Sequence, residues 1–477
     1  MDVHEEEDSE GTVMTIATVD PATGRTLATF PALDAHGVEE RLRLAAETFE
    51  RYRTTAFDHR SQLLRRAADK LTADREEVAR TLVTEMGKPL AQARAEADKC
   101  AKSMRWFADH APGLLADQLP EAADVADSGA ATVRVRFRPL GPVLAVMPWN
   151  FPLWQVIRAA APALMAGDVL LLKHASNVPR TALYLQELFT GAGDEPGCFQ
   201  TLLISSGQVA DVIRDDRVAA VTLTGSEGAG QAVATVAGEQ LKKCVLELGG
   251  SDPFVVLPSA DVAAAAQVAV RARVQNNGQS CIAAKRFIVH EAVFDEFTRA
   301  FVEGMRALRV GDPMQEHTDV GPLATEQGRT DIEEQVEDAR GKGARVLCGG
   351  RRPPEQTEGW YYEPTVLTDI DPAMRLHHEE CFGPVATLYR VPNLAAAVEL
   401  ANDTPYGLSS NAWTRDPDEQ GVLARDLQAG GVFFNGMTAS HPAFPFGGVK
   451  RSGYGRELDG LGIREFTNPT TLWYAAE

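Results

Sequence analysis

Hydrophobic positions recur every three or four residues along the first part of the chain. From about residue 38 to residue 106 they are interspersed with charged positions, as in DHRSQLLRRAADKLTADREEVARTLVTEMG, which spans 58–87. This spacing places the apolar side chains on one face of each helix. Gly87 is the expected end of one helix, because glycine adopts the left-handed conformation found after many helices. The pattern predicts a layer of amphipathic helices.

A strand period replaces the helical one after Pro120. The segment TVRVRFRPLG alternates apolar residues with Arg134, Arg136 and Arg138, which predicts a strand with one face in water. An anion site built from the three arginines is the alternative. Isolated charge patterns are weak evidence for binding, so a solvated or subunit-facing strand is the preferred interpretation.

Short apolar runs alternate with helical stretches from residue 141 to about residue 257. Five runs are each followed by a turn and a helical pattern: GPVLAVMP, GDVLLLKH, CFQTLLIS, VAAVTLTG and KKCVLELGG. The alternation predicts a parallel sheet with helices on both faces, and nucleotides bind beyond the carboxyl ends of such strands. A second α/β stretch follows, from about Asp252 to about Lys450. The tail FTNPTTLWYAAE predicts a terminal strand without a local partner.

Composition and charge exclude several classes of protein. The chain has 477 residues, of which 44% are hydrophobic and 24% charged, as is typical of a globular protein with more than one buried core. Its formal net charge of −20 argues against nucleic-acid binding, which requires clustered cations. Residues 1–12 are acidic and predict a solvated tail, not a signal peptide. No apolar stretch approaches the ~20 residues of a membrane span.

The cysteines narrow the chemistry further. None of the six forms a CxxC pair, which argues against a zinc site or a dense disulfide framework. We therefore expect a cytoplasmic enzyme that acts on a small molecule and requires no metal, nucleic acid or membrane.

The segment GQSC, from Gly278 to Cys281, ends a helical run. A lone cysteine is usually buried filler, and this is the expected role of Cys100, Cys198 and Cys348. Gly-Gln-Ser instead indicates an accessible turn, where backbone amides approach an anion and a thiolate can act as a nucleophile.

Two further segments place polar groups at the ends of apolar runs. Glu247 in VLELGG is followed by two glycines, which let substrate or cofactor approach the backbone. A strand-end ion pair is its ordinary role, but a partly desolvated glutamate can act as a general base. The turn in LTGSEGAG lies at a predicted helix N-terminus and can hold a pyrophosphate, although its spacing is not GxGxxG.

The segment PWNFPLWQVIRAAAPALMAGD carries one amide and one cation. Asn150 precedes Pro152 at a predicted helix start, so it is either an N-cap or an amide donor for an oxyanion. Trp154 and Arg158 stand four residues apart and share a helix face. Arg158 is the only charge before Asp168, and it is either a buried structural partner or a receptor for a carboxylate.

These segments, in this order, resemble the aldehyde dehydrogenase superfamily from about Asp20 to Trp473. EECFGP (379–384) and PFGGVKRSGYGRE (445–457) extend the resemblance. It implies an α/β fold with a doubly wound, Rossmann-like cofactor domain, an α/β catalytic domain and a small β oligomerisation element. The expected boundaries are 13–120 and 140–248 for the cofactor domain, 249–450 for the catalytic domain, and 121–139 and 451–477 for the oligomerisation element. The element is expected to pair subunits into a homodimer or homotetramer.

The resemblance also implies roles for individual residues. Cys281 forms a thiohemiacetal with the aldehyde, and the Asn150 amide and the Cys281 N–H form the oxyanion hole. Hydride passes to a nicotinamide, and Glu247 activates the water that hydrolyses the thioester. The residues implied in cofactor binding are Trp149, Lys173, Ser176, Gly225, Ser226, Leu248, Glu380 and Phe382.

The adenosine end departs from a common family pattern. Many members have Lys-Pro-Ser-Glu, whose glutamate receives the ribose hydroxyls, where this chain has Lys173-His174-Ala175-Ser176. Without that carboxylate a 2′-phosphate meets no repulsion, and Lys173 and Ser176 can hold it. We expect NADP⁺ to be preferred over NAD⁺ and His174 to be a packed loop residue.

Within the superfamily, KHASN, NFPLWQVIR and GGVKRSGYGREL most resemble bacterial enzymes that oxidise succinate semialdehyde to succinate. Arg158 matches their receptor for the distal carboxylate, with Trp154 and Phe446 beside it. A second arginine of some relatives is Gln275 here, so glutarate semialdehyde and uncharged aldehydes remain alternatives. Ala283 stands where some relatives have a second cysteine, so we expect no disulfide switch.

Two other activities compete with hydrolytic oxidation. CoA-acylating members of the fold generally lack a glutamate at the position of Glu247, which favours hydrolysis here. A non-catalytic structural protein on this fold is the remote alternative. The full set of Cys281, Glu247, Asn150 and Glu380 argues against it.

Overall fold

Four helices form the layer predicted from the first hydrophobic pattern. The computed structural model describes residues 15–193 and 195–475, so the predicted tail at 1–12 lies outside the described residues. The hairpin of β1 (Thr15–Asp20) and β2 (Arg25–Pro31) precedes α1 (Ala35–Tyr52), α2 (Phe57–Ala73), α3 (Arg75–Met86) and α4 (Leu90–Leu114). Helix α3 ends at Gly87, whose φ of 81° is left-handed, as predicted. A Cβ there would lie 2.7 Å from the Pro322 carbonyl oxygen, so this glycine is also required for packing.

The five predicted apolar runs form a parallel sheet. They are β4 (Pro142–Met147), β5 (Val169–His174), β6 (Phe199–Thr201), β7 (Ala220–Thr224) and β8 (Lys243–Glu247). The strand order is β16-β8-β7-β4-β5-β6, with the short β16 (Gly453–Tyr454) antiparallel at one edge. The intervening helices are α6 (Trp154–Ala166), α7 (Pro179–Ala192), α8 (Val209–Arg214) and α9 (Glu227–Glu239). The chain adds β5 and β6 on one side of β4 and then returns to add β7 and β8 on the other side. The strand order therefore reverses between β4 and β7, which is where such folds bind ligands.

A second sheet follows, as predicted for the stretch after Asp252. Its order is β11-β12-β13-β10-β9-β14-β15, and only the β11–β12 pairing is antiparallel among these strands. The strands are β9 (Pro253–Val256), β10 (Arg286–His290), β11 (Arg345–Cys348), β12 (Thr365–Thr368), β13 (Val385–Val391), β14 (Ser410–Trp413) and β15 (Val432–Phe434). The helices are α10 (Val262–Val274), α11 (Glu291–Arg306), α12 (Glu326–Gly341), α13 (Arg375–His378), α14 (Leu394–Asn402) and α15 (Pro417–Asp426). Together the two sheets confirm the predicted α/β fold class.

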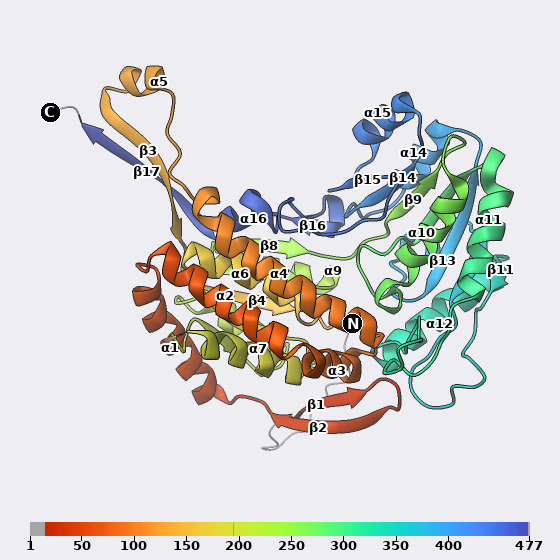
Figure 1. Ribbon diagram of the computed structural model, residues 1–477, viewed down its shortest axis with the longest axis horizontal. Coiled ribbons are helices and arrows are strands. Elements are labelled where there is room, and N and C mark those ends of the chain that lie inside the picture. The colour runs from red at the N-terminus through yellow and green to blue at the C-terminus, as the bar shows by residue number, and fades with distance from the viewer. Residues whose placement is uncertain (1–14, 194, 476–477) are drawn as a thin grey trace.

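A two-stranded arm projects from the body beside the short α5 (Ala122–Asp127) (Figure 1). It pairs the arginine-rich β3 (Ala130–Pro139) with the C-terminal β17 (Thr467–Ala475) over most of their lengths, which supplies the partner that the tail sequence lacks. Between β16 and β17, α16 (Asp459–Glu465) contacts α4 and α6. The C-terminal strand of the arm therefore begins at Thr467, later than residue 451, where the predicted oligomerisation element begins. The domain boundaries stay predictions. No helix among the described residues is long and apolar enough to cross a membrane.

Candidate active site

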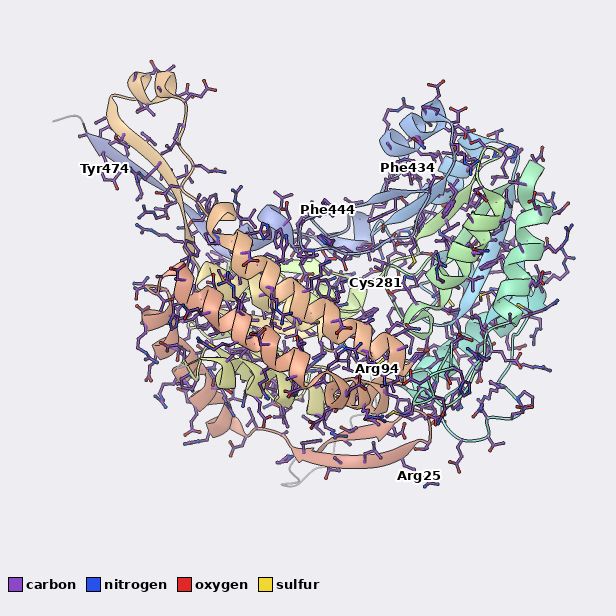
Figure 2. All side chains as sticks on the ribbon, viewed as in Figure 1. Arg25, Arg94, Cys281, Phe434, Phe444 and Tyr474 are labelled. Atoms are coloured by element: carbon purple, nitrogen blue, oxygen red, sulfur yellow. The ribbon has the colours of Figure 1, made fainter. Side chains whose placement is uncertain are left out.

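The predicted site residues converge at the carboxyl edge of the six-stranded sheet. Trp149 and Asn150 follow β4, and Lys173 is the penultimate residue of β5, with Ser176 in the turn after that strand. Gly225 and Ser226 follow β7, and Glu247 and Leu248 lie at the end of β8. The segments after α10 and α13 bring Cys281, Glu380 and Phe382 to the same edge. Figure 2 shows Cys281 at the centre of the molecule, between the two sheets.

The turn that carries Cys281 is built from an unusual backbone. Asn276, Asn277 and Gly278, within the 3₁₀ turn η1 (Gln275–Gly278), have φ of 55°, 59° and 77°. A Cβ on Gly278 would lie 2.3 Å from the Gly383 backbone, so the GQSC and ECFGP motifs touch through their main chains. Asn277 ties the turn down by donating to the Gly87 and Pro322 carbonyls at 2.8 and 2.9 Å. Sequence reasoning missed the two asparagines, although asparagine is the side chain that best tolerates this conformation.

Asn150 points its amide at the Cys281 turn. Its Nδ2 donates to the Gln279 carbonyl at 3.2 Å, and Asn276 Nδ2 donates to the Asn150 carbonyl at 2.7 Å. Helix α6 begins only at Trp154, so the N-cap interpretation of Asn150 is wrong. The N–H groups of Leu153 and Trp154 donate to the buried Glu96 carboxylate of α4, each at 2.9 Å. A carboxylate from another helix thus caps α6, and Asn150 remains available as an amide donor beside residue 281.

The Cys281 thiol lies in a half-buried and positively biased environment. Burial raises its pKa to about 12, and the charges of Lys285 and Arg158 act in the opposite direction. Lys285 Nζ donates to the Cys281 carbonyl at 2.6 Å and pairs with Glu380 at 3.1 Å. The resting thiol is therefore protonated and needs a base on the path to the thiolate. Lys285 was not predicted, because nothing in its local sequence separates it from an ordinary strand-start lysine.

Glu247 is buried and lies beside a second carboxyl group. Neither of its carboxyl oxygens has a hydrogen-bond partner among the described residues. Burial raises its pKa and the neighbouring Glu457 raises it further, while Arg158 and Arg456 oppose the shift. A Cβ on Gly447 would lie 2.7 Å from Glu247 Oε1, so a glycine of the PFGG motif makes room for this carboxylate. A carboxyl group with a raised pKa is suited to accept a proton near neutral pH.

Glu380 and Phe382 occupy the other side of the site. A Cβ on Gly249 would lie 2.5 Å from Glu380 Oε2, and Gly250 N–H donates to Glu380 Oε1 at 3.1 Å. The two glycines of ELGG therefore admit the Glu380 carboxylate. The Phe382 ring contacts Trp149 edge to face, with centroids 5.7 Å apart.

The edge after β5 and β7 fits a nucleotide phosphate. Ser226 caps α9 by accepting from the Ala229 N–H at 3.3 Å, so the helix N-terminus opens toward the strand ends. Leu248 packs on Gly230, where a Cβ would lie 2.6 Å from the leucine side chain. Ser176 is exposed in the turn after Lys173.

His174 is packed, as predicted, but it is the last residue of β5 and not a loop residue. Its Nδ1 lies 3.1 Å from the Met147 carbonyl oxygen and 3.0 Å from the Ala175 nitrogen, and its Nε2 lies 3.0 Å from the Pro152 carbonyl oxygen. Burial lowers its pKa to about 4, so the ring is neutral and joins the end of β5 to the loop around Asn150.

The residues predicted to bind substrate lie together, but the Arg158 charge is already paired. Arg158 is 2% exposed and forms an ion pair with the equally buried Glu457. Its guanidinium lies 4.7 Å from the centroid of the Phe446 ring. The Trp154 ring faces Lys99, whose ammonium is 4.0 Å from a ring centroid. The sequence did not identify Glu457 as a site residue, although Glu457 ends the GYGRE motif. It gave no signal for Lys99.

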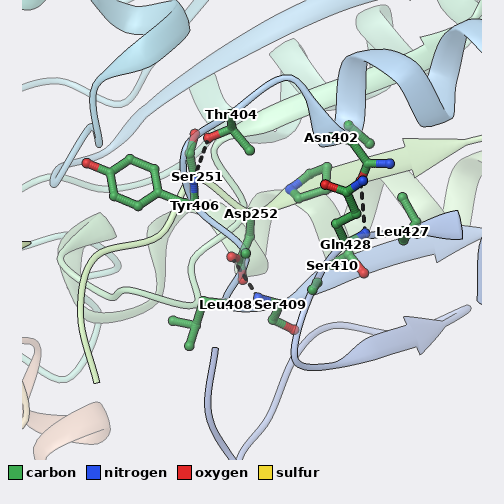
Figure 3. Close-up of a pocket in the computed structure, with 14 residues that line it drawn as sticks. Ser251, Asp252, Asn402, Thr404, Tyr406, Leu408, Ser409, Ser410, Leu427 and Gln428 are labelled. Carbon is green, nitrogen blue, oxygen red and sulfur yellow. Dashed lines mark hydrogen bonds between the residues drawn. The ribbon is translucent and has the colours of Figure 1, made fainter. Parts of the chain in front are cut away.

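Two cavities open beside these residues. One has a free volume of about 140 Å³ and is lined by Ser440, Phe444 and Phe446 among others, which suits a small aldehyde. The other is close to Asp252, which accepts from the Ser409 N–H at 3.1 Å (Figure 3). Its free volume is about 10 Å³, room for one water molecule at most.

Comparison with known proteins agrees with this geometry. The profile of the aldehyde dehydrogenase family matches residues 7–472. Succinate-semialdehyde dehydrogenase [NADP(+)] 1 of Mycobacterium tuberculosis is 57% identical over 462 residues, which cover 97% of this chain and 100% of the relative. The corresponding Mycobacterium avium enzyme is 58% identical, with coverage of 96% and 97%. The solved succinic semialdehyde dehydrogenase of Streptococcus pyogenes, in complex with NADP⁺, has a TM-score of 0.93 and 35% identity, with coverage of 97% and 100%.

Proposed function

The chain belongs to the aldehyde dehydrogenase family, and on that premise we propose that it oxidises succinate semialdehyde to succinate with NADP⁺ as the preferred acceptor. The observation that carries the proposal is the meeting of Cys281, Asn150 and Glu247 at one sheet edge, with the Asn150 amide donating beside the nucleophile at Gln279. Relatives that carry this activity in their names share 57–58% of their residues with the chain.

The Cys281 thiol gives its proton to a water molecule, its sulfur attacks the aldehyde carbon, and the carbonyl oxygen becomes an oxyanion. The Asn150 Nδ2 and the Cys281 N–H stabilise this oxygen, as donors fixed before the reaction begins. When bound, the nicotinamide supplies the hydride acceptor that turns the thiohemiacetal into a thioester. Glu247 then takes a proton from water, the water oxygen attacks the thioester carbon, and the acid leaves as the Cys281 sulfur is released.

The cofactor preference rests on the turn after β5. Lys173 and Ser176 would hold the 2′-phosphate of NADP⁺, and Ser226 with the first turn of α9 would hold the pyrophosphate. Trp149, Gly225, Leu248, Glu380 and Phe382 complete the proposed groove, with Glu380 on the nicotinamide ribose. That the Streptococcus pyogenes relative is described in complex with NADP⁺ supports this assignment.

Steady-state kinetics of the purified enzyme test the proposal. Succinate semialdehyde should exceed butanal, which has the same number of carbons, by about a hundredfold in kcat/KM, or about 2.7 kcal/mol of transition-state discrimination. NADP⁺ should exceed NAD⁺ by the same measure, and no added thiol such as CoA should be required. Equal kcat/KM values for butanal and succinate semialdehyde would contradict the substrate assignment but not the membership of the aldehyde dehydrogenase family. A higher value for glutarate semialdehyde would make this longer semialdehyde the substrate.

Assembly and location complete the proposal. The β3–β17 arm would pair subunits into a dimer or tetramer, supported by the exposed Trp473 and Tyr474 side chains on it. Light scattering at working concentration checks this, and a monomer would contradict it. The six cysteines are free, in keeping with a reducing compartment such as the cytoplasm, which cell fractionation can test.

A further inference from the structure

The turn between α3 and α4 and the first turns of α4 contact the loop that carries the proposed nucleophile. Gly87 lies in this turn, and its carbonyl accepts from Asn277 Nδ2 at 2.8 Å. Farther along, the side chain of Gln92 on α4 accepts from the Asn276 N–H at 2.7 Å. The start of one helix therefore holds two consecutive residues of the turn before Cys281.

The same face of α4 holds the loop that carries Asn150. Gln92 and Glu96 stand four residues apart, so they share a face of the helix. One carboxyl oxygen of Glu96 accepts from the N–H groups of Leu153 and Trp154, each at 2.9 Å. A carboxylate here satisfies two amides at the start of α6 and complements the positive end of the helix dipole. The end of the Asn150 loop is thus fixed from α4.

Lys88 orients the Glu96 carboxylate. The two side chains are buried and form an ion pair through the other carboxyl oxygen. The Lys88 ammonium also lies 4.3 Å from the centroid of the Phe151 ring, which belongs to the Asn150 loop. Replacing a buried ion pair by apolar residues often leaves stability unchanged, so stability is a weak reason for this pair. Its contacts point instead to a role in positioning the loop.

The two loops are also tied to each other. Asn276 Nδ2 donates to the Asn150 and Gln279 carbonyls at 2.7 and 3.0 Å. Asn150 Nδ2 donates to the Gln279 carbonyl at 3.2 Å, two residues before Cys281. A displacement of either loop would therefore move the Asn150 amide relative to the nucleophile.

We propose that Gln92 and Glu96 are positioning residues for the reaction, which fix the Asn150 loop against the turn that carries Cys281. Neither side chain has to touch the aldehyde. Their contacts set where the Asn150 amide stands before the reaction begins, and a donor already in place stabilises an oxyanion without reorganisation. The inference rests on the proposed function, because it assumes that Asn150 donates to the oxyanion.

Two double variants isolate the contact of Glu96 with α6. Lys88→Met/Glu96→Leu removes the ion pair and the acceptor of the two amides, whereas Lys88→Met/Glu96→Gln removes the pair but keeps an amide oxygen that can accept from them. The measured quantity is the first-turnover rate of NADPH formation, with the aldehyde that the wild type oxidises best. We expect the Leu variant to lower this rate about a hundredfold and the Gln variant to keep it within about tenfold. Equal rates in the two variants would overturn the proposal.

Asp98→Asn is the matched control. Asp98 is an exposed acid of the same helix and pairs with Arg75 at the surface, so its loss should leave the first-turnover rate unchanged. A hundredfold loss in this variant as well would show that the rate responds to any change in α4, which contradicts a specific role for Glu96.

A double-mutant cycle with Asn150→Ala shows whether Glu96 acts through the amide. In the wild-type enzyme this substitution should lower the first-turnover rate at least about a hundredfold. In the Lys88→Met/Glu96→Leu background it should lower the rate less than about tenfold, because the amide is already displaced. The full loss in both backgrounds would overturn the proposal, since the effects of independent sites add.

Gln92→Leu repeats the cycle without removing a buried charge, and it decides the matter if melting temperatures show that the double variants unfold. We expect a loss of about tenfold that disappears in the Asn150→Ala background. If Asn150→Ala retains the wild-type rate, the proposed role of Asn150 fails, and with it the premise. If Asn150→Ala loses the rate while Gln92→Leu and Lys88→Met/Glu96→Leu both retain it, only the positioning role fails.

Discussion

The turn at residues 276–281 is largely buried, whereas the turn at residues 174–177 is exposed at Ser176. In the first, main chain meets main chain at Gly278 and Gly383, and asparagine side chains secure the loop from both sides. In the second, the His174 ring lies within 3.1 Å of three backbone groups and the Ala175 N–H donates to the Met147 carbonyl at 2.9 Å, whereas Ser176 is exposed. With the proposed roles of the two turns, this difference predicts that substitutions at the nucleophile turn are restricted by backbone contact, while cofactor choice can change through the single exposed side chain of Ser176.

The comparison predicts the largest loss at the nucleophile. Cys281→Ser should lower kcat by at least about 10⁴, because an alcohol in a desolvated site is a far poorer nucleophile than a thiolate. The absorbance rise of NADPH measures this. Cys348→Ser, at a half-buried cysteine outside the site, should retain full activity, and comparable loss in both variants would contradict the assignment of the nucleophile.

Gly278→Ala should break the packed turn. The new Cβ would lie 2.3 Å from the Gly383 backbone at a φ of 77°, and we expect a loss of about 2–4 kcal/mol in the free energy of unfolding. Urea titration measures the change. Gly238→Ala is the matched control, because its Cβ meets no atom within 4 Å in the exposed last turn of α9. It should be neutral or stabilising by up to about 1 kcal/mol. Equal effects at both glycines would show that the turn is not constrained.

Ser176→Glu should change the exposed turn without harming the packed one. A carboxylate at this position would repel the 2′-phosphate and can receive the ribose hydroxyls, so the preference for NADP⁺ over NAD⁺ should fall about a hundredfold. The ratio of kcat/KM for the two cofactors measures it. Ser176→Ala should lower the preference less. A parallel loss of activity with both cofactors would mean that the turn serves the chemistry as well.

Local patterns predicted most of the fold. The five apolar runs became the five parallel strands, and Gly87 ends α3 as its position in the helical pattern indicated. The tail strand lacked a visible partner, because β3 and β17 pair across most of the chain. Likewise, the local sequence suggested an N-cap at Asn150 as readily as an oxyanion donor. Only the start of α6 at Trp154 and the position of Glu96 against it excluded the N-cap.

The sequence by itself determined the types of the elements and the family, and it supplied the reacting groups that are proposed, since periodicity and short motifs depend on neighbours along the chain. Tertiary structure decided which charges are paired. Arg158 of α6 meets Glu457 only because two segments far apart in the chain pack together. The physical reason is that ion pairing and desolvation depend on distances of a few ångströms, which are set only when those segments pack.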